Sequence, residues 1–303
     1  MFNNIDRMIE KARSSPPLKL AVAAAADRKV LEGVMRARGE DIIDPLLVGD
    51  EAEIEKCLEK MNYEPSELEI VPAETDREAA DKAIELVHKD QADFPMKGML
   101  KTDLILHSLL KDEYGLKKDR LISLVTMMEL EREERMILMS DPGMNIDPDL
   151  GEKIEIMKNA VEVAHSLGIE TPKVALLAAV ESVSNRMPAT EDAAVISKMC
   201  ERGQLGECVV DGPLALDNII SPRAAAQKKI DSEVAGSADI IIVPYIEVGN
   251  VLYKAMVTYA GVRSASIVTG AEVPVVVTSR ADTFETRFNS IALAKLVLEG
   301  QTV

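Results

Sequence analysis

The chain has 303 residues, a length that suits one large or two medium-sized domains. Hydrophobic residues make up 47% and charged residues 29%, which is typical of globular proteins and excludes disordered or fibrous chains. The 52 acidic residues outnumber the 35 basic ones, so the net charge of −17 predicts repulsion from nucleic-acid phosphates and from anionic lipid. We therefore expect no nucleic-acid partner and no membrane partner.

The N-terminal stretch MFNNIDRMIEKARSS is charged and amphipathic, and it lacks the apolar core of a signal peptide. The three cysteines, Cys57, Cys200 and Cys208, form no CxxC motif. Both features predict a cytoplasmic protein with reduced thiols. The three histidines form no HExxH motif, and the sixteen glycines contain no GxG pair. We expect neither a metal site nor a permanently bound cofactor.

Apolar runs alternate along the chain with amphipathic stretches, beginning with LKLAVAAAA at 18–26. The pair Thr75 and Glu78 predicts a capping box at the start of a helix over 75–90. We expect further strands at 44–50, 68–74, 92–98, 120–130, 173–179, 206–212, 238–244, 265–270 and 273–279. We expect further helices at 29–39, 51–61, 102–111, 145–168, 189–203, 249–261 and 283–300.

This alternation predicts an α/β fold with mainly parallel sheets. The stretch SDPGMNIDPD at 140–149 is rich in turn-forming residues and is the expected boundary between two domains. In such folds ligands bind beyond the carboxyl ends of the strands, so the loop after each apolar run is where functional residues are expected.

The loop after 92–98 carries Lys97, Gly98, Lys101 and Thr102 before a helix start. This loop is suited to binding an anion, because a glycine lets the backbone approach it, the helix start offers free N–H groups and two lysines add positive charge. The structural alternative is a solvated loop without a ligand. A second group of candidate anion-binding residues lies at the end of the run 273–279 and just after it. Its arginine has a planar guanidinium that can bind phosphate or carboxylate with two hydrogen bonds. That group comprises Ser279, Arg280, Asp282 and Glu285, and a salt-bridged helix start is its structural alternative.

Two more loops follow apolar runs in the second half. Asp211 and Gly212 come after ECVV, and Glu247, Gly249 and Asn250 come before a helix that carries Lys254. Asp and Asn in these places are also common helix caps. Together, the four loops suit a metal-free reaction on a phosphate-bearing substrate.

The run VDGPLALDNIISPRAAAQKKIDSEVAGSADIIIVPYIEVGNVLYKA resembles the hallmark segment of the phosphate acyltransferases. The run ASIVTGAEVPVVVTSRADTFETRFNSIALA resembles their closing segment, and the resemblance covers nearly the whole chain. The variants KVALLAAVE, MPATEDAAV, VDGPLALDN, TSRAD and PMKGMLKTD are similar to the phosphate butyryltransferase branch rather than to the phosphate acetyltransferase branch.

The resemblance implies reversible transfer of a short acyl group, with butyryl preferred, between CoA and inorganic phosphate. It implies two α/β/α domains facing a cleft, as in the isocitrate and isopropylmalate dehydrogenases, with the last helix returning to the first domain. The expected domains are therefore 1–140 plus about 284–303, and 141–283. It further implies CoA, acyl-CoA, acyl phosphate and phosphate as small-molecule partners, and a homodimer or larger homo-oligomer.

The family's serine–arginine pair falls on Ser279 and Arg280, which implies that Arg280 binds phosphate and that Ser279 binds the carbonyl or phosphate oxygen. The acetyl branch has its aspartate base six residues after that arginine, where this chain has Thr286. Asp282 and Glu285 are the nearby carboxylates that remain as alternatives for the base.

An acetyl-branch arginine corresponds to His107, and the missing charge is expected from Lys97, Lys101 and Arg120. The full set of residues assigned to substrate binding is Lys97, Gly98, Lys101, Thr102, His107, Arg120, Ser123, Asp211, Gly212, Asn250 and Lys254.

We expect direct attack by the CoA thiolate, because Cys200 and Cys208 have the sequence surroundings of structural cysteines. The functional alternatives are a phosphate acetyltransferase, a dehydrogenase of the isocitrate type, and a non-catalytic protein that binds acyl-CoA or acyl phosphate.

Overall fold

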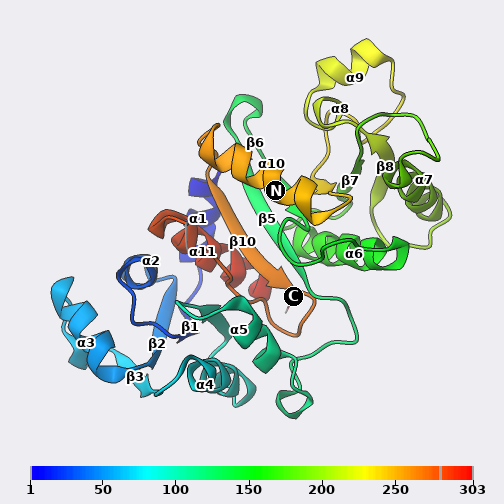
Figure 1. Cartoon of the computed structure of the whole chain (residues 1–303). Coiled ribbons are helices and arrows are strands. Elements are labelled where there is room, and N and C mark those ends of the chain that lie inside the picture. The colour runs from blue at the N-terminus through cyan, green and yellow to red at the C-terminus, as the bar shows by residue number, and fades with distance from the viewer. Residues whose placement is uncertain (1, 280–281, 302–303) are drawn as a thin grey trace. The chain divides into compact units, whose positions relative to one another are not determined.

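The computed structural model describes residues 2–279 and 282–301, and it confirms an α/β fold with mainly parallel sheets. The chain divides into two compact units, coloured by residue number in Figure 1. Unit 2 contains Ile5–Arg120 together with the described chain from Ala265 onward. Unit 1 contains Leu121–Ser264. No helix in the described ranges is both long enough and apolar enough to cross a membrane.

Unit 2 contains a parallel four-stranded sheet in the order β3-β2-β1-β4. Its central strand β1 places four consecutive buried residues, Leu20–Ala23, between its neighbours, as expected for a strand covered on both faces. The strands are β1 (Leu18–Ala23), β2 (Ile43–Gly49), β3 (Glu69–Pro72) and β4 (Phe94–Lys97).

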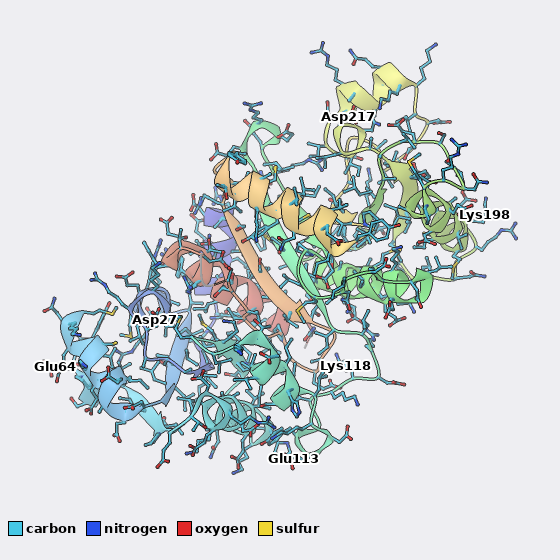
Figure 2. The ribbon with its side chains drawn as sticks, viewed as in Figure 1. Asp27, Glu64, Glu113, Lys118, Lys198 and Asp217 are labelled. Atoms are coloured by element: carbon cyan, nitrogen blue, oxygen red, sulfur yellow. The ribbon has the colours of Figure 1, made fainter. Side chains whose placement is uncertain are left out.

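The helices of unit 2 connect and cover this sheet. Helices α2 and α3 connect β1 to β2 and β2 to β3, and α4 connects β3 to β4 and packs against β1, β2 and β4. Because such crossovers are generally right-handed, this strand order is expected to put α2 and α3 on one face and α4 on the other. The last helix, α11, packs against α1 and α2. Helix α2 begins after Asp27, labelled in Figure 2, whose carboxylate accepts a hydrogen bond from the N–H of Val30 at 3.0 Å. The helices are α1 (Ile5–Arg13), α2 (Arg28–Gly39), α3 (Glu51–Lys60), α4 (Asp76–His88), α5 (Thr102–Leu109) and α11 (Phe284–Gln301).

In unit 1 the strands follow the order β5-β6-β9-β7-β8. Strands β5 and β6 form an antiparallel hairpin, whereas the pairs β6–β9, β9–β7 and β7–β8 are parallel. The strands are β5 (Ser123–Leu130), β6 (Arg135–Ser140), β7 (Lys173–Leu177), β8 (Val209–Leu214) and β9 (Ile240–Ile242).

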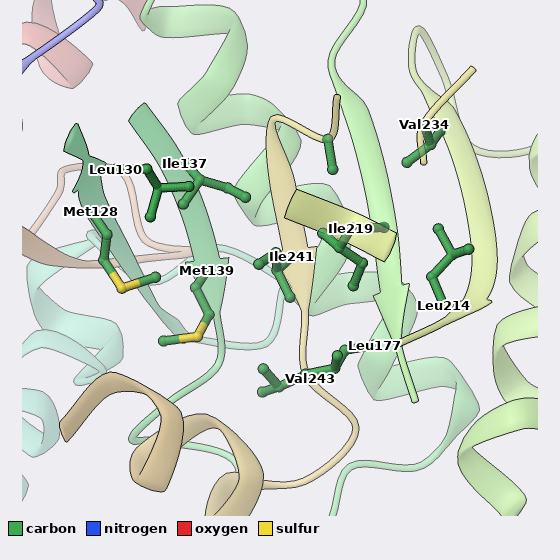
Figure 3. Close-up of a cluster of buried hydrophobic side chains, with 12 residues drawn as sticks. Met128, Leu130, Ile137, Met139, Leu177, Leu214, Ile219, Val234, Ile241 and Val243 are labelled. Atoms are coloured by element: carbon green, nitrogen blue, oxygen red, sulfur yellow. The ribbon is translucent and has the colours of Figure 1, made fainter. Parts of the chain in front are cut away.

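One apolar core joins these strands to the helices that cover them. Figure 3 shows Met128, Ile137 and Ile241 from three strands and Ile219 of a covering helix within one cluster. All four side chains are at most 2% exposed, so the core buries this face of the sheet almost completely. The helices are α6 (Leu150–Ser166), α7 (Pro188–Glu201), α8 (Leu216–Ile220), α9 (Pro222–Lys228) and α10 (Ile246–Thr258).

The structure differs from the sequence expectations in several elements, among them the helices α1, α8 and α9, which were not expected. Strand β6 was not expected, and because it pairs with β5, the expected boundary at 140/141 falls inside unit 1. Compact units are not independently folding domains, so the expected domain division stays a prediction. The expected strand at 273–279 is absent from the described secondary structure. Val275 and Val276 make only single bridges, and Pro274 has no N–H for a ladder. Ahead of this segment lies β10 (Ser264–Thr269).

Candidate active site

Lys97 ends β4 with its side chain turned into the following loop. Only 4% of Lys97 is exposed, and its ammonium donates hydrogen bonds to the carbonyl oxygens of Gly98 and Leu100, both at 3.1 Å. These acceptors offset the cost of burying the charge. Gly98 is required because a Cβ there would lie 2.2 Å from the carbonyl oxygen of Ala24. The loop after β4 is therefore held close to the end of β1.

A cavity of ≈380 Å³ opens at this loop. Four of the predicted site residues line it, so the structure brings together two segments that are far apart in the sequence. Asp103 adds one carboxylate to a lining that otherwise holds two lysines. The lining residues are Lys97, Leu100, Lys101, Thr102, Asp103, Thr278 and Ser279.

Asp282 is hydrogen-bonded to Ser279. Its carboxylate accepts a hydrogen bond from the N–H of Ser279 at 2.6 Å, and the carbonyl of Ser279 accepts one from the N–H of Asp282 at 3.1 Å. Burial raises the pKa of Asp282, against the opposing effects of the Ser279 N–H and of the charges on Arg287 and Lys97. A carboxyl with a raised pKa beside a serine is suited to accepting a proton. Arg280, the predicted phosphate ligand, lies outside the described residues.

Arg287 of α11 is a residue that the sequence analysis missed. Only 2% of it is exposed, and its guanidinium donates to the carbonyl oxygens of Ser279 at 3.1 Å, of Thr283 at 3.2 Å and of Asp282. A Cβ on Gly33 of α2 would lie 3.0 Å from the Cβ of Arg287, so a glycine there permits the close helix contact. Arg287 therefore holds the segment that carries Ser279 and Asp282.

The other residues at the start of α11 have different surroundings. Glu285 is exposed in the first helical turn. Thr286 is 8% exposed, and its N–H donates to the hydroxyl of Thr283 at 3.1 Å, a contact typical of a helix start. Asp282 is therefore the predicted carboxylate that the described contacts tie to Ser279.

Besides Gly98, two predicted substrate-binding residues of unit 2 do not line the cavity. His107 is exposed in the last turn of α5, and Arg120 is exposed near the end of this part of the unit. Their predicted roles remain untested by these positions.

In unit 1, Ser123 is fully buried at the start of β5. Its hydroxyl accepts a hydrogen bond from the side-chain amide of Asn159 at 3.0 Å, which is a structural contact. Asp211 and Gly212 were expected in a loop after a strand, but they lie within β8. Gly212 is needed there because a Cβ would lie 2.6 Å from the Cβ of Leu176 on β7.

Asn250 was expected in a loop before a helix, but α10 begins at Ile246 and contains it. Its side-chain amide donates to the carbonyl oxygen of Pro142 at 3.1 Å, so it ties α10 to the loop after β6. Lys254 is exposed on the same helix.

Asp141, which follows β6, is a second residue that the sequence analysis missed. It is 3% exposed, and its carboxylate accepts hydrogen bonds from the N–H groups of Gly143 at 2.8 Å and Met144 at 2.9 Å. Burial raises its pKa against these donors. The only sequence signal was the turn-rich stretch SDPGMN, which indicated a domain boundary instead.

The cysteines are placed as structural residues. Cys208 is 9% exposed, and burial raises the pKa of its thiol to about 12, so it stays protonated at neutral pH. The thiol of Cys200 donates to the carbonyl of Cys208 at 3.2 Å. Neither arrangement favours a covalent acyl-cysteine.

Comparisons with known proteins agree with the resemblance in the sequence. The family model for phosphate acetyl/butaryl transferase matches residues 77–295. The phosphate butyryltransferase of Clostridium acetobutylicum is 46% identical over 98% of this chain and 99% of its own. The phosphate acetyltransferase of Thermotoga maritima is also 46% identical, over 96% of this chain and 98% of its own.

Solved structures agree as well. A branched-chain phosphotransacylase from Enterococcus faecalis is similar with a TM-score of 0.83 and 32% identity, over 93% of this chain and 99% of its own. A 4-hydroxythreonine-4-phosphate dehydrogenase from Klebsiella pneumoniae shares the fold, with a TM-score of 0.57 and 10% identity over 94% of this chain and 100% of its own. The dehydrogenase-like fold is thus confirmed. The family model matches residues 77–295, and the two relatives match almost the whole chain, so the chain belongs to the phosphate acetyl/butaryl transferase family of acyltransferases.

Proposed function

We propose that the protein transfers a short acyl group, butyryl in preference to acetyl, reversibly between CoA and inorganic phosphate. The observation that carries this proposal is the cavity in which Ser279 meets Lys97, Lys101 and Thr102, with Asp282 hydrogen-bonded to Ser279. Cations, a hydroxyl and a carboxylate with a raised pKa are the groups that acyl transfer to or from phosphate requires.

In the direction that forms acyl-CoA, Asp282 accepts the proton of the CoA thiol. The thiolate attacks the carbonyl carbon of the acyl phosphate, a C–S bond forms, and the C–O bond to phosphate breaks. Phosphate leaves with the electron pair of that bond. Because a free thiol has a pKa of about 8.5, a carboxylate in hydrogen-bond reach is sufficient as the base.

The cations act on the other partner. Lys101 and Thr102, which line the cavity at the start of α5, are proposed to bind the leaving phosphate. The same role is proposed for Arg280 from the family resemblance. The Ser279 hydroxyl is proposed to donate to the carbonyl oxygen, where each preorganised donor contributes on the order of 3–4 kcal/mol to transition-state stabilisation. Lys97 is proposed to contribute positive charge to the cavity without moving, because its ammonium is hydrogen-bonded to two carbonyls of the loop after β4.

The acyl preference rests on the butyryl-branch motifs in the sequence. A relative named as a butyryltransferase and one named as an acetyltransferase have the same sequence identity to this chain, 46%, so transfer of acetyl is the alternative. A non-catalytic protein that only binds acyl-CoA is less well supported, because it would not need a carboxylate beside Ser279.

We further propose that CoA enters only as a substrate, with no permanently bound cofactor. A cytoplasmic homodimer or larger assembly is also part of the proposal, supported by the family resemblance. Light scattering on the purified protein measures the mass of the assembly, and a monomer would contradict that part.

The test of the activity is release of the CoA thiol from butyryl-CoA with and without phosphate. We expect release that requires phosphate, and faster release from butyryl-CoA than from acetyl-CoA at equal concentrations. Absence of release from any short-chain acyl-CoA would rule out the proposed activity, and faster release from acetyl-CoA would reverse the proposed preference.

A further inference from the structure

A second cavity, of ≈540 Å³, lies wholly within unit 2, and we call it the aromatic cavity. It is lined by α2, the turn after α3 and the start of α11, three elements that are labelled in Figure 1. Its volume suits a small molecule, because such sites usually measure about 300–1,000 Å³. None of its described lining residues also lines the cavity of Ser279. The lining includes Glu32, Met35, Arg36, Gly39, Tyr63 and Phe284.

Exposed aromatic side chains form part of this lining. Tyr63 is 37% exposed and Phe284 is 39% exposed, in a chain with only four phenylalanines and five tyrosines. The thioethers of Met35 and Met61 belong to the same lining, and sulfur makes favourable contacts with aromatic rings. Gly39 leaves room beside them, since a Cβ there would meet nothing within 4 Å. A flat aromatic ring therefore finds ring faces, sulfur atoms and open space in this cavity.

The charged side chains of the aromatic cavity favour a ligand that donates hydrogen bonds. Arg36 is already engaged, because its Nε donates to Glu40 at 3.0 Å and its guanidinium lies 4.1 Å from the centre of the Phe288 ring. Glu32 accepts from Arg28 at 2.8 Å through Oε1, and among the described residues no hydrogen bond reaches its Oε2. Two carboxylates beside one paired guanidinium repel phosphate and carboxylate groups. Glu32 can thus accept a hydrogen bond from an amino group.

The aromatic cavity borders the segment that carries the proposed catalytic groups. Phe284 is the first residue of α11, two residues after Asp282 and three before Arg287. The carbonyl oxygen of Phe284 lies 3.0 Å from the position of a Cβ on Gly33, so α2 and the first turn of α11 are in tight contact. Arg287 in that turn holds the carbonyls of Ser279 and Asp282. A ligand that covers Phe284 therefore restrains the turn that positions these two residues.

We propose that the aromatic cavity is a second small-molecule site, which binds a flat aromatic ring bearing an amino group and, when occupied, restrains the start of α11. The ring contacts Tyr63 and Phe284, and the amino group donates to Glu32. The expected effect on turnover rests on the proposed function, whereas binding and restraint do not.

Isothermal titration calorimetry tests the binding. The probe is 2-aminobenzimidazole, a flat ring with an amino group, and benzimidazole-2-carboxylate is the matched anion. We expect saturable binding of the amine and none of the carboxylate. Saturating butyryl-CoA should not weaken the binding of the amine, because the two cavities share no described lining residue.

Variants locate the bound amine. Gly39→Leu fills the cavity and should abolish binding, whereas Gly39→Ala adds one methyl group and should retain it. Glu32→Gln should raise the Kd by about tenfold through loss of a charged acceptor. Its matched control is Glu55→Gln, since Glu55 is exposed on α3 and does not line the cavity. Urea unfolding transitions establish that each variant is folded.

Hydrogen exchange measures the restraint of α11. With the amine bound, peptides that cover 284–292 should exchange more slowly by at least about twofold, and peptides of α6 should not change. Neither segment should respond to the amine in Gly39→Leu. In the active enzyme, the bound amine should also raise kcat, because Ser279 and Asp282 are held more firmly.

The proposal is overturned if the wild type does not bind the amine, if Gly39→Leu binds it equally well, or if butyryl-CoA displaces it. Unchanged exchange in α11 with the amine bound also overturns it. If the wild type releases no thiol but the amine still binds and slows this exchange, the proposed activity fails and the second site stands.

Discussion

The guanidinium of Arg287 donates a hydrogen bond of 3.1 Å to the carbonyl oxygen of Ser279, from eight residues further along the chain. The same guanidinium bonds the carbonyls of Asp282 and Thr283, so one buried cation holds both ends of the short segment between Ser279 and α11. Its charge also lowers the pKa of Asp282, against the stronger effect of burial. The proposed catalytic groups therefore depend on a residue outside the cavity.

Replacing Arg287 should impair catalysis more than substrate binding. We expect Arg287→Met to lower kcat by about 100-fold through misplacement of Ser279. Because the cation no longer lowers the pKa of Asp282, the acidic limb of the pH–rate profile should move to higher pH. Arg287→Lys keeps the charge and should leave that limb in place, and added guanidinium should partly restore Arg287→Ala. An unchanged acidic limb in Arg287→Met would contradict this account.

Asp282 and Glu285 can be separated as bases by matched amide substitutions. We expect Asp282→Asn to lower kcat by about 100-fold or more, as usual for loss of a general base. Glu285→Gln should stay within about twofold of wild type, because Glu285 is exposed. In the wild type, activity should fall as the pH drops through the raised pKa of Asp282, since the base must be ionised. The assignment fails if Glu285→Gln is the more impaired variant.

Gly98 is expected to tolerate no side chain. The methyl group in Gly98→Ala would meet the carbonyl oxygen of Ala24 at 2.2 Å, so the loop must shift. We expect the free energy of unfolding to fall by about 1–3 kcal/mol and the KM for phosphate to rise. The control is Gly39→Ala at the end of α2, where nothing lies within 4 Å of the new methyl group. That variant should gain up to about 1 kcal/mol, and equal effects at both glycines in urea denaturation would contradict the structure.

Lys295 on α11 is a buried cation whose expected role is structural. It is fully buried and donates to the carbonyls of Ser15 at 3.1 Å, Pro16 at 2.8 Å and Ile42 at 3.2 Å. Lys295→Met removes this donor from all three carbonyls, of which that of Ile42 still accepts from the N–H of Leu18 at 3.2 Å. Each buried group left unpaired costs about 1–3 kcal/mol. Exposed Lys11→Met on α1 is the control and should change stability by less than about 0.5 kcal/mol.

The stability difference between wild type and Lys295→Met should also depend on pH. Burial lowers the pKa of Lys295 in the folded protein, against the opposing charge of Glu299. Between the folded pKa and the unfolded value of about 10.4, the unfolded chain binds the additional proton. The stabilising contribution of Lys295 is therefore lost as the pH falls through the folded pKa, and the difference should be larger at pH 10 than at pH 7. A difference that shrinks with rising pH would contradict the buried position.

Much of the fold follows from local pattern. Apolar runs such as 18–26 and 238–244 are buried on both faces of parallel strands, and this pattern is visible in the sequence. The expected domain division puts Lys97 and Ser279 in different domains, whereas both line one cavity within unit 2 of the structure.

The remaining features depend on tertiary contacts. The sequence DGP at 211–213 has the composition of a turn, yet it continues β8, because Gly212 packs directly against Leu176. Arg287 resembles a surface position in an amphipathic helix. Its burial is possible because three backbone carbonyls of the segment that precedes α11 turn toward it.

The most direct test of the central claim identifies the acyl acceptor. Butyryl-CoA and phosphate are incubated with the wild-type protein and with Ser279→Ala, and the products are followed by ³¹P NMR together with thiol release. We predict one butyryl phosphate formed for each CoA released by the wild type, and at least about 100-fold slower formation by Ser279→Ala. Release of CoA with free butyrate and no acyl phosphate would make water the acceptor and contradict the account.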